Sequence, residues 1–222
     1  MKGEKASLIF VSIMLVIVIL FGLNRFNFDT GEKVIEIKEY QGERLDSVYD
    51  FRENSILGPQ EINVTDYRLR ISGLVENPLE YTYDEVLENF SSERKVIRLS
   101  CVEGWSTKVL WEGVSITDLV KEAQPSEKAE IIIFHAEDGY TTSLHFDYIK
   151  ERNIMLAYKI NDVTLPKENG FPFQLVAESK WGYKWCRWVV ELELSDDTDY
   201  EGFWESRGYS NDADLDKSFW GK

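Results

Sequence analysis

The N-terminal part of the chain contains an uninterrupted apolar run, which limits what this part can form. The run Ala6–Asn24 carries no charged residue and lies between Lys5 and Arg25. At about 1.5 Å of helical rise per residue, its 19 residues span roughly 28 Å, close to the thickness of a bilayer core. A cleavable signal has a shorter apolar region followed by small residues, whereas GLNRFNF follows here. We therefore expect residues 1–25 to form an uncleaved transmembrane anchor.

Charges beside this run favour one orientation in the membrane. Lys2, Lys5 and the terminal amine favour a cytoplasmic N-terminus, although Arg25, Lys33 and Lys38 follow closely. The balance predicts that the rest of the chain lies outside the cytoplasm.

The remaining chain reads as one domain with short flanking segments. We expect a polar stalk over residues 26–50, a domain over 51–210 and an acidic, aromatic tail over 211–222. Hydrophobic residues at 43% and charged residues at 29% suit a globular protein with a full core. The formal charge of −15 leaves no basic stripe for phosphates and therefore argues against nucleic acid as a partner.

Strand patterns outnumber helix patterns. In DYRLRISGLV, period-two alternation puts Tyr67, Leu69 and Ile71 on one face. Further strands are expected in KVIRLSC, EIIIFHA, YTTSLHF, NIMLAYKI, PFQLVAE and CRWVVELEL. The class predicted is α+β, mainly β.

Two short helices are expected between these strands. Thr82 and Glu85 form a capping-box pattern ahead of an apolar pair. In GVSITDLVKEAQP, Ser115 and Asp118 mark a helix start and Pro125 closes the segment.

Several kinds of site are excluded by the residues. His135 and His145 are the only histidines, too few for a histidine-built metal centre, and each is expected on a strand or the surface. The DADLD run from Asp212 to Asp216 lacks the glycine and the closing Glu of a calcium loop, since Lys217 takes the glycine position. No G-x-S-x-G, G-x-G-x-x-G or Walker pattern occurs.

Cys101, in SCVEGW, is one of two cysteines and ends an expected strand. The residues alone leave three readings open: a buried thiol, a disulfide with Cys186, or a metal ligand. They favour the readings in that order, because Cys186 lies in the apolar YKWCRWVVEL segment, where a buried thiol needs no partner. A single thiolate can hold a metal only when other ligands come from a cofactor.

A wider resemblance reverses this order. RLSCVEGWSTKVLWEGVSITDLV resembles the molybdenum-binding segment of the sulfite-oxidase superfamily of molybdopterin enzymes, and the similarity continues through IMLAYKINDVTLPKENGFPFQLVAESKWGYKWCRWVVELEL and YEGFWESRGYSN. It covers residues 50–210 and is strongest to the small single-domain branch, such as the catalytic subunit of periplasmic methionine-sulfoxide reductase. It implies a sulfite-oxidase-like molybdopterin-binding fold and a molybdenum-molybdopterin cofactor.

The resemblance also implies roles for individual residues. Cys101 would be the thiolate ligand of molybdenum, Asn54 would line the metal site and Tyr158 would lie near the metal. The remaining expected cofactor contacts are Leu57, Gly58, Asn169, Gln174, Lys184, Trp185, Cys186 and Arg187.

Some of these positions have ordinary alternatives. Arg187 is the first choice for the cation that binds the pterin phosphate and Lys184 the second, although either could sit on a solvated strand edge. Gln174 stands where the family usually has an arginine. Tyr158 could be core, as could Trp105, Trp111 and Trp185, which could instead form pocket walls.

The function implied is two-electron or oxygen-atom-transfer chemistry by a membrane-anchored oxidoreductase, acting as the reductase of an S- or N-oxide. Sulfite oxidation is the alternative. Asn54 weakens it because sulfite oxidases carry an arginine there, while nearby Arg52 supports it. A tethered binding module that has lost its cofactor is the rival from another class, and a structural disulfide domain is a third reading.

The expected partners follow from the same reading. They are a small-molecule substrate, the membrane and a haem- or quinone-linked membrane protein that exchanges electrons, because the chain has no C-x-x-C-H haem motif. Exported members of the superfamily normally use a twin-arginine signal, and MKGEKASL contains no Arg-Arg pair. An atypical signal, a cytoplasmic domain or unusual cofactor acquisition would each account for that.

Overall fold

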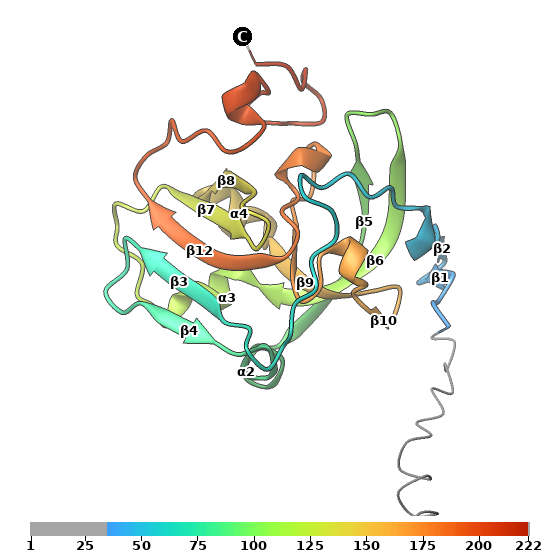
Figure 1. Cartoon of the computed structure of the whole chain (residues 1–222), viewed down its shortest axis with the longest axis horizontal. Helices are drawn as coiled ribbons and strands as arrows, with labels where there is room; N and C mark the ends of the chain where they lie inside the picture. The colour runs from blue at the N-terminus through green and yellow to red at the C-terminus, as the bar shows by residue number, and fades with distance from the viewer. Residues whose placement is uncertain (1–34, 222) are drawn as a thin grey trace, which may run out of the picture. The chain divides into compact units, whose positions relative to one another are not determined.

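Two five-stranded sheets make up the fold, which a computed structural model describes for residues 35–221 (Figure 1). The first sheet has the order β10-β9-β6-β5, with β11 also paired to β9, and all its pairs are antiparallel. Its strands are β5 (Ser92–Ser100), β6 (Ser106–Ser115), β9 (Met155–Ile160), β10 (Val163–Thr164) and β11 (Gln174–Val176). The longest pair, β5 with β6, ends in the turn that carries Cys101.

The second sheet has the order β4-β3-β12-β7-β8. Its strands are β3 (Leu69–Gly73), β4 (Leu79–Tyr81), β7 (Ile131–Ala136), β8 (Thr141–His145) and β12 (Val189–Ser195). Only β12 and β3 run parallel, with Leu192 opposite Ile71. A separate two-stranded ribbon joins β1 (Glu39–Tyr40) and β2 (Glu43–Arg44).

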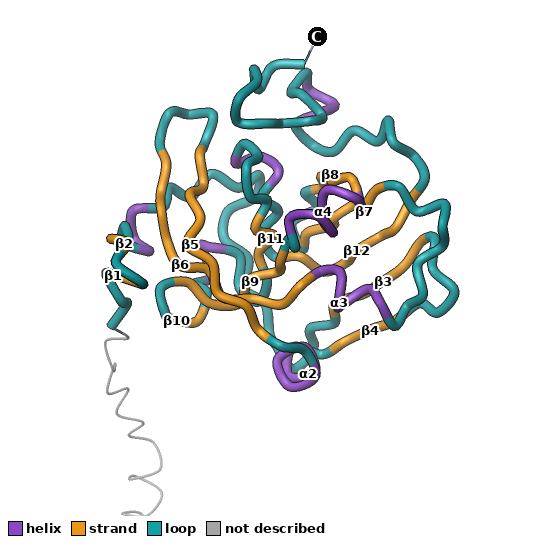
Figure 2. Tube along the Cα trace, turned by 180° about the vertical axis from the view of Figure 1, so that it is seen from behind, coloured by secondary structure: helices purple, strands orange, loops and turns teal. Residues whose placement is uncertain are grey.

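Short helices connect the strands, as Figure 2 shows. They are α2 (Tyr83–Asn89), α3 (Ile116–Lys121) and α4 (Phe146–Arg152), with 3-10 turns η1 (Val48–Asp50), η2 (Lys167–Asn169), η3 (Gly182–Lys184) and η4 (Glu205–Arg207). The predicted mainly-β class is therefore confirmed.

Local predictions were largely confirmed. Tyr67, Leu69 and Ile71 are 5%, 0% and 1% exposed, so the alternation does mark a buried face. Thr82 caps α2 in a reciprocal capping box with Glu85. Ser115 precedes α3 as predicted but makes no side-chain cap, because its hydroxyl instead donates to Asn153 Oδ1 at 2.7 Å.

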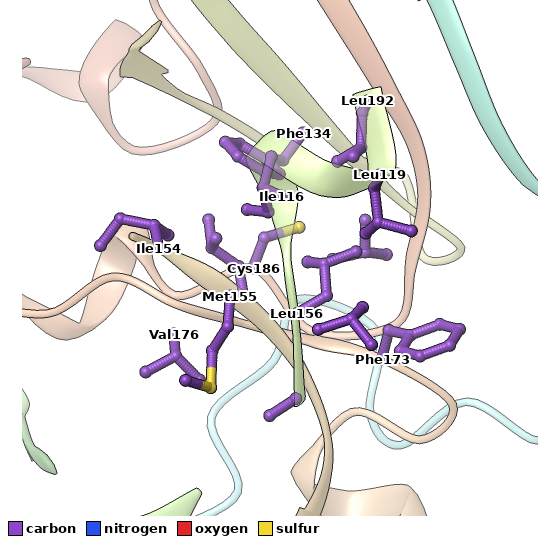
Figure 3. Close-up of a cluster of buried hydrophobic side chains, with 14 of the residues drawn as sticks. Ile116, Leu119, Phe134, Ile154, Met155, Leu156, Phe173, Val176, Cys186 and Leu192 are labelled. Atoms are coloured by element: carbon purple, nitrogen blue, oxygen red, sulfur yellow. The ribbon is translucent and has the colours of Figure 1, made fainter. Parts of the chain in front are cut away.

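Cys186 belongs to the buried core and not to a strand, since β12 begins three residues later at Val189. Figure 3 shows its side chain near Ile116 and Phe134 in a cluster drawn from both sheets. Both cysteines are free, so the disulfide reading is wrong.

The compact unit extends further than the predicted domain, over Glu36–Lys222. Glu36 accepts hydrogen bonds from Ser47 Oγ at 2.6 Å and the Val48 backbone N–H at 2.8 Å, within the expected stalk. Lys180 Nζ lies 2.5 Å from Asp214 Oδ1, which joins the expected tail to the domain. The expected anchor, residues 1–25, lies outside the described residues. Within residues 35–221, no helix has the length and apolar character needed to cross a membrane.

Candidate functional site

A pocket of about 170 Å³ opens at the end of the domain where β5 gives way to the turn before β6. Five other segments complete it: residues 54–56, the β7–β8 turn, Gln174 at the start of β11, residues 182–188 around η3, and the C-terminal segment, residues 201–221. In Figure 1 the β5–β6 turn and the C-terminal segment lie at the same end of the domain. Segments distant in sequence therefore meet at one cavity.

Cys101 lies in this pocket with its side chain almost fully buried, 6% exposed. The turn is held by the Cys101 N–H donating to the Trp105 carbonyl at 2.9 Å, and the Asn54 amide lies 3.6 Å from Sγ. Burial raises the pKa of the Cys101 thiol. The backbone N–H of Glu103, the Arg187 guanidinium and the Asn54 amide oppose that rise. These groups can stabilise a thiolate at the pocket floor.

Gln174, at the start of β11, also lies on the floor and is 0% exposed. Its side-chain oxygen and nitrogen both lack a hydrogen-bond partner among the described residues. A buried amide without partners is costly, at roughly 1–3 kcal/mol for each unmet group. Gln174 therefore presents a donor and an acceptor ready for a polar ligand.

Arg187 and Asp138 place opposite charges in the pocket wall. Arg187 Nη1 lies 3.5 Å from Glu53 Oε1, and burial lowers the pKa of this guanidinium. Burial raises the pKa of Asp138, while the Tyr140 N–H, at 3.0 Å from its carboxylate, opposes the rise. Arg187 keeps its charge in this setting because guanidinium is a very weak acid.

Aromatic side chains form much of the remaining wall. Trp185 and Trp188 are buried, at 4% and 1% exposure, while Trp105, Trp204 and Tyr209 are half-buried. Trp105 Nε1 donates to Glu103 Oε2 at 3.0 Å at the exposed rim. The buried part of the lining therefore combines polar side chains with Trp185 and Trp188, and half-buried aromatic side chains lie nearer to solvent.

The structure brings five predicted residues together in the lining, namely Asn54, Cys101, Gln174, Trp185 and Arg187. Trp105 also lines it, as one reading of the sequence allowed. Trp111 does not, because its ring is 0% exposed and packs against Trp185 with centroids 5.6 Å apart.

Four other predicted contacts lie outside the lining. Leu57 is 73% exposed to solvent, and Gly58 follows it in a turn with φ of +83°. Asn169 is buried in η2, where the next residue, Gly170, packs against Arg187. Tyr158 does not face the cavity, because its hydroxyl lies 3.1 Å from Glu112 on the neighbouring strand β6.

Lys184 and Cys186 do not line the cavity either. Lys184 is fully buried away from the pocket, with Nζ 2.6 Å from Glu205 Oε1, so its charge is already matched. Cys186 is 0% exposed in the core, and burial raises its pKa well above the ordinary value. Lys184 and Cys186 alternate along the sequence with Trp185 and Arg187, which do line the pocket. The sequence alone therefore does not indicate which of these four neighbours face the cavity.

Sequence reasoning missed Asp138, Tyr140, Trp188, Trp204 and Tyr209, all of which line the pocket. The Asp138–Gly139 pair is a hairpin turn signal between two strand patterns and could have marked that turn. Nothing in the local sequence indicates that the turn faces Cys101. Trp204 and Tyr209 lie within the predicted domain, but the sequence assigned them no role at the site.

Comparison with known proteins shows the family to which the chain belongs. Residues 57–204 match the family described as "Oxidoreductase molybdopterin binding domain". The chain belongs to this family and is a molybdenum-cofactor-dependent oxidoreductase with a sulfite-oxidase-like fold. The resemblance seen in the sequence is therefore confirmed.

Particular relatives carry more specific names. The chain is 32% identical over 152 residues to the "Uncharacterized oxidoreductase YuiH" of Bacillus subtilis, covering 68% of this chain and 76% of that protein. It is 25% identical over 188 residues to the "Protein-methionine-sulfoxide reductase catalytic subunit MsrP" of Xanthomonas campestris, covering 77% of this chain but 58% of that one. The sulfane dehydrogenase SoxCD from Paracoccus pantotrophus matches with a TM-score of 0.62 and 25% identity, over 70% of this chain and 43% of that chain.

Proposed function

We propose that this protein reduces an S- or N-oxide at a molybdenum held by Cys101. The observation that carries the proposal is the pocket floor, where the Cys101 thiol and the unpartnered amide of Gln174 face one cavity. A pterin offers several hydrogen-bonding heteroatoms, which an amide with a free donor and acceptor can satisfy. Soft thiolate ligation suits molybdenum, and the thiol must lose its proton to bind.

The residues present fit such a cofactor. Cys101 would ligate the metal, Gln174 would bind the pterin, and Arg187 would bind the phosphate through its planar fork of donors. Asn54 would hold the thiolate sulfur, since its amide lies 3.6 Å from Sγ. The bound cofactor supplies two-electron redox chemistry, and the protein supplies its orientation and surroundings.

Reduction of a sulfoxide breaks the S–O bond, consumes two electrons and two protons, and releases the sulfide and water. Asp138 is the side chain that we assign to proton delivery, because it lines the pocket and burial favours its protonated form. The buried side chains of Trp185 and Trp188 restrict water around the reacting atoms. The electrons come from a partner.

The pocket charges favour a neutral substrate over sulfite. Glu103 is acidic, and Arg187, the one basic residue that lines the pocket among residues 35–221, has Glu53 beside it and would be occupied by the phosphate. Arg52 is exposed and does not line the pocket. An anion such as sulfite would therefore meet unfavourable charge. The name of the similar Xanthomonas protein, a methionine-sulfoxide reductase, supports the same choice.

A metal analysis combined with an activity assay tests the proposal. The full chain, expressed in a host that makes molybdenum cofactor, should contain about one molybdenum per chain, and Cys101→Ser should contain almost none. The wild type should reduce sulfoxides or N-oxides with a reduced dye as electron donor and should oxidise sulfite slowly at most. Loaded protein that oxidises sulfite and reduces no oxide would establish the alternative activity. An empty wild type would favour the cofactor-less binding module.

We further propose the cellular setting from the sequence. Residues 1–25 would anchor the protein with the catalytic domain outside the cytoplasm, and a haem- or quinone-linked membrane protein would supply electrons. Carbonate extraction of membranes and protease protection in spheroplasts test this: the protein should stay with the membrane, and the domain should be cut by added protease. Release by carbonate or protection from protease would contradict the assignment.

A further inference from the structure

The C-terminal segment, residues 201–221, forms the outer wall of the pocket. Trp204 and Tyr209 both line it, with ring centroids 5.2 Å apart. The family match ends at residue 204, so it includes Trp204 but not Tyr209. Both residues lie in the YEGFWESRGYSN stretch that resembles the superfamily, and the resemblance assigned neither of them a role.

A buried ion pair fixes this segment to the domain. Lys184 Nζ lies 2.6 Å from Glu205 Oε1, and both side chains are 0% exposed. The Thr142 hydroxyl donates to the same carboxylate oxygen at 2.6 Å, and Lys184 Nζ also donates to Asn211 Oδ1 at 3.0 Å. One ammonium group thus anchors Glu205 and Asn211, which lie before and after Tyr209 in the sequence.

Close backbone contact adds to this anchoring. The Phe203 N–H donates to the Thr141 carbonyl at 2.9 Å, and a Cβ on Gly202 would lie only 2.3 Å from that same oxygen. Tyr183 packs edge-on against Tyr209 with centroids 5.0 Å apart. The segment is therefore built against the domain in one position and can hold Trp204 and Tyr209 in a fixed arrangement.

Depth separates this wall from the groups assigned to the cofactor. Gln174 and Cys101 are 0% and 6% exposed at the floor, whereas Trp204 and Tyr209 are half-buried toward solvent. A substrate that enters from solvent passes the aromatic wall before it reaches the floor. Aromatic faces bind aromatic and sulfur-bearing groups favourably and select little for charge.

We propose that Trp204 and Tyr209 determine substrate specificity by contacting the organic substituent next to the reacting oxide, with Lys184 and Glu205 as positioning residues. This inference rests on the proposed oxide reduction. It predicts preference for a sulfoxide with an aromatic substituent over a small one.

The test compares methyl phenyl sulfoxide with dimethyl sulfoxide on molybdenum-loaded full-length protein. Trp204→Ala and Tyr209→Ala should each raise the KM for the phenyl compound about tenfold, a typical effect of a lost apolar contact. The KM for dimethyl sulfoxide and both kcat values should change less than about twofold. Tyr200→Ala is the matched control, because Tyr200 is a half-buried aromatic directly before the segment and lies outside the lining. Trp204→Phe keeps a ring and should give a smaller shift of about threefold.

A separate measurement tests the positioning role of Lys184 and Glu205. Glu205→Gln keeps the shape of the side chain but removes its charge, and it should raise the KM for the phenyl compound about threefold without changing kcat for dimethyl sulfoxide. A fall in kcat for both compounds would show a merely structural effect and overturn the positioning role.

Equilibrium binding separates failure of the wall from failure of the proposed reaction. By calorimetry, the loaded wild type should bind methyl phenyl sulfoxide about tenfold more tightly than dimethyl sulfoxide, whether or not it turns them over. If the protein binds methyl phenyl sulfoxide more tightly but reduces neither compound, the proposed oxide reduction is wrong and the role of Trp204 and Tyr209 in binding is supported. Equal binding of the two compounds, or equal KM changes in the variants, would overturn the wall.

Discussion

Removing the Glu205 carboxylate should destabilise the whole domain, because it leaves the Lys184 ammonium buried without its counter-ion. The two groups lie 2.6 Å apart with no solvent exposure. Burial lowers the pKa of Lys184, and the neighbouring Glu205 charge opposes that shift. The ammonium would keep two neutral acceptors, the Ser143 carbonyl and Asn211 Oδ1, each at 3.0 Å.

These contacts determine how much unfolding free energy the Glu205→Ala variant should lose. Breaking a buried ion pair by removing one partner costs about 3–5 kcal/mol, and the two remaining acceptors place this case near the lower end. The Thr142 hydroxyl also loses its acceptor, which costs about 1 kcal/mol more. We expect Glu205→Ala to lower the free energy of unfolding by about 4 kcal/mol.

Equilibrium urea unfolding of the full chain at pH 7, followed by tryptophan fluorescence, measures this loss. The control is the double variant Lys184→Met with Glu205→Leu, which removes both charges together and should stay within about 2 kcal/mol of wild type. If Glu205→Ala costs less than about 1 kcal/mol, or if the double variant is as unstable as the single one, the ion pair does not anchor the segment as argued.

Three further results are expected. Hydrogen bonds to Glu36 outweigh the burial that would raise its pKa and lower it to about 2, from an ordinary 4.5. Because solvent screens a partly exposed carboxylate, wild type should exceed Glu36→Gln by about 1 kcal/mol of unfolding free energy above pH 4.5. The difference should vanish as the pH falls toward 2, where the folded-state carboxylate becomes protonated. Asp138→Asn should lower kcat/KM for oxide reduction about 100-fold and flatten its pH profile, measured by initial rates. Gly113→Ala should cost at least about 3 kcal/mol in urea unfolding, because a Cβ there would lie 2.2 Å from the Leu156 carbonyl oxygen.

Each of these expectations has a clear contrary result. A constant difference between wild type and Glu36→Gln across pH 2–7 would mean that the carboxylate charge is not involved. An unchanged pH profile for Asp138→Asn would remove that residue from proton delivery. Gly139→Ala is the control for Gly113, because its Cβ would meet no atom within 4 Å, although its φ of +80° adds some strain. Equal losses at the two glycines would argue against the close strand contact.

Much of the local structure followed from the sequence because short-range patterns cause it. Alternation at Tyr67, Leu69 and Ile71 predicts a half-buried strand since successive side chains point to opposite faces. The Thr82 and Glu85 pair closes a capping box within four residues, so no distant group is needed. At Ser115 the same reasoning failed, because Asn153, distant in the chain, takes the hydroxyl.

The family resemblance located Cys101, Asn54, Gln174 and Arg187, which do line one pocket. It could not decide which of Arg187 and Lys184 lies in the pocket, since both are basic residues only three positions apart. Only the fold shows that one faces the cavity and the other is buried against Glu205.

The sequence by itself determined the strand-rich class, the apolar N-terminal run, and the cysteine to which the proposed molybdenum site is assigned. Tertiary structure alone decided that Asp138, Trp204 and Tyr209 share a cavity with that cysteine. The physical reason is distance along the chain. Periodicity and capping act over a few residues, whereas a pocket is formed by segments that meet only when both sheets are packed.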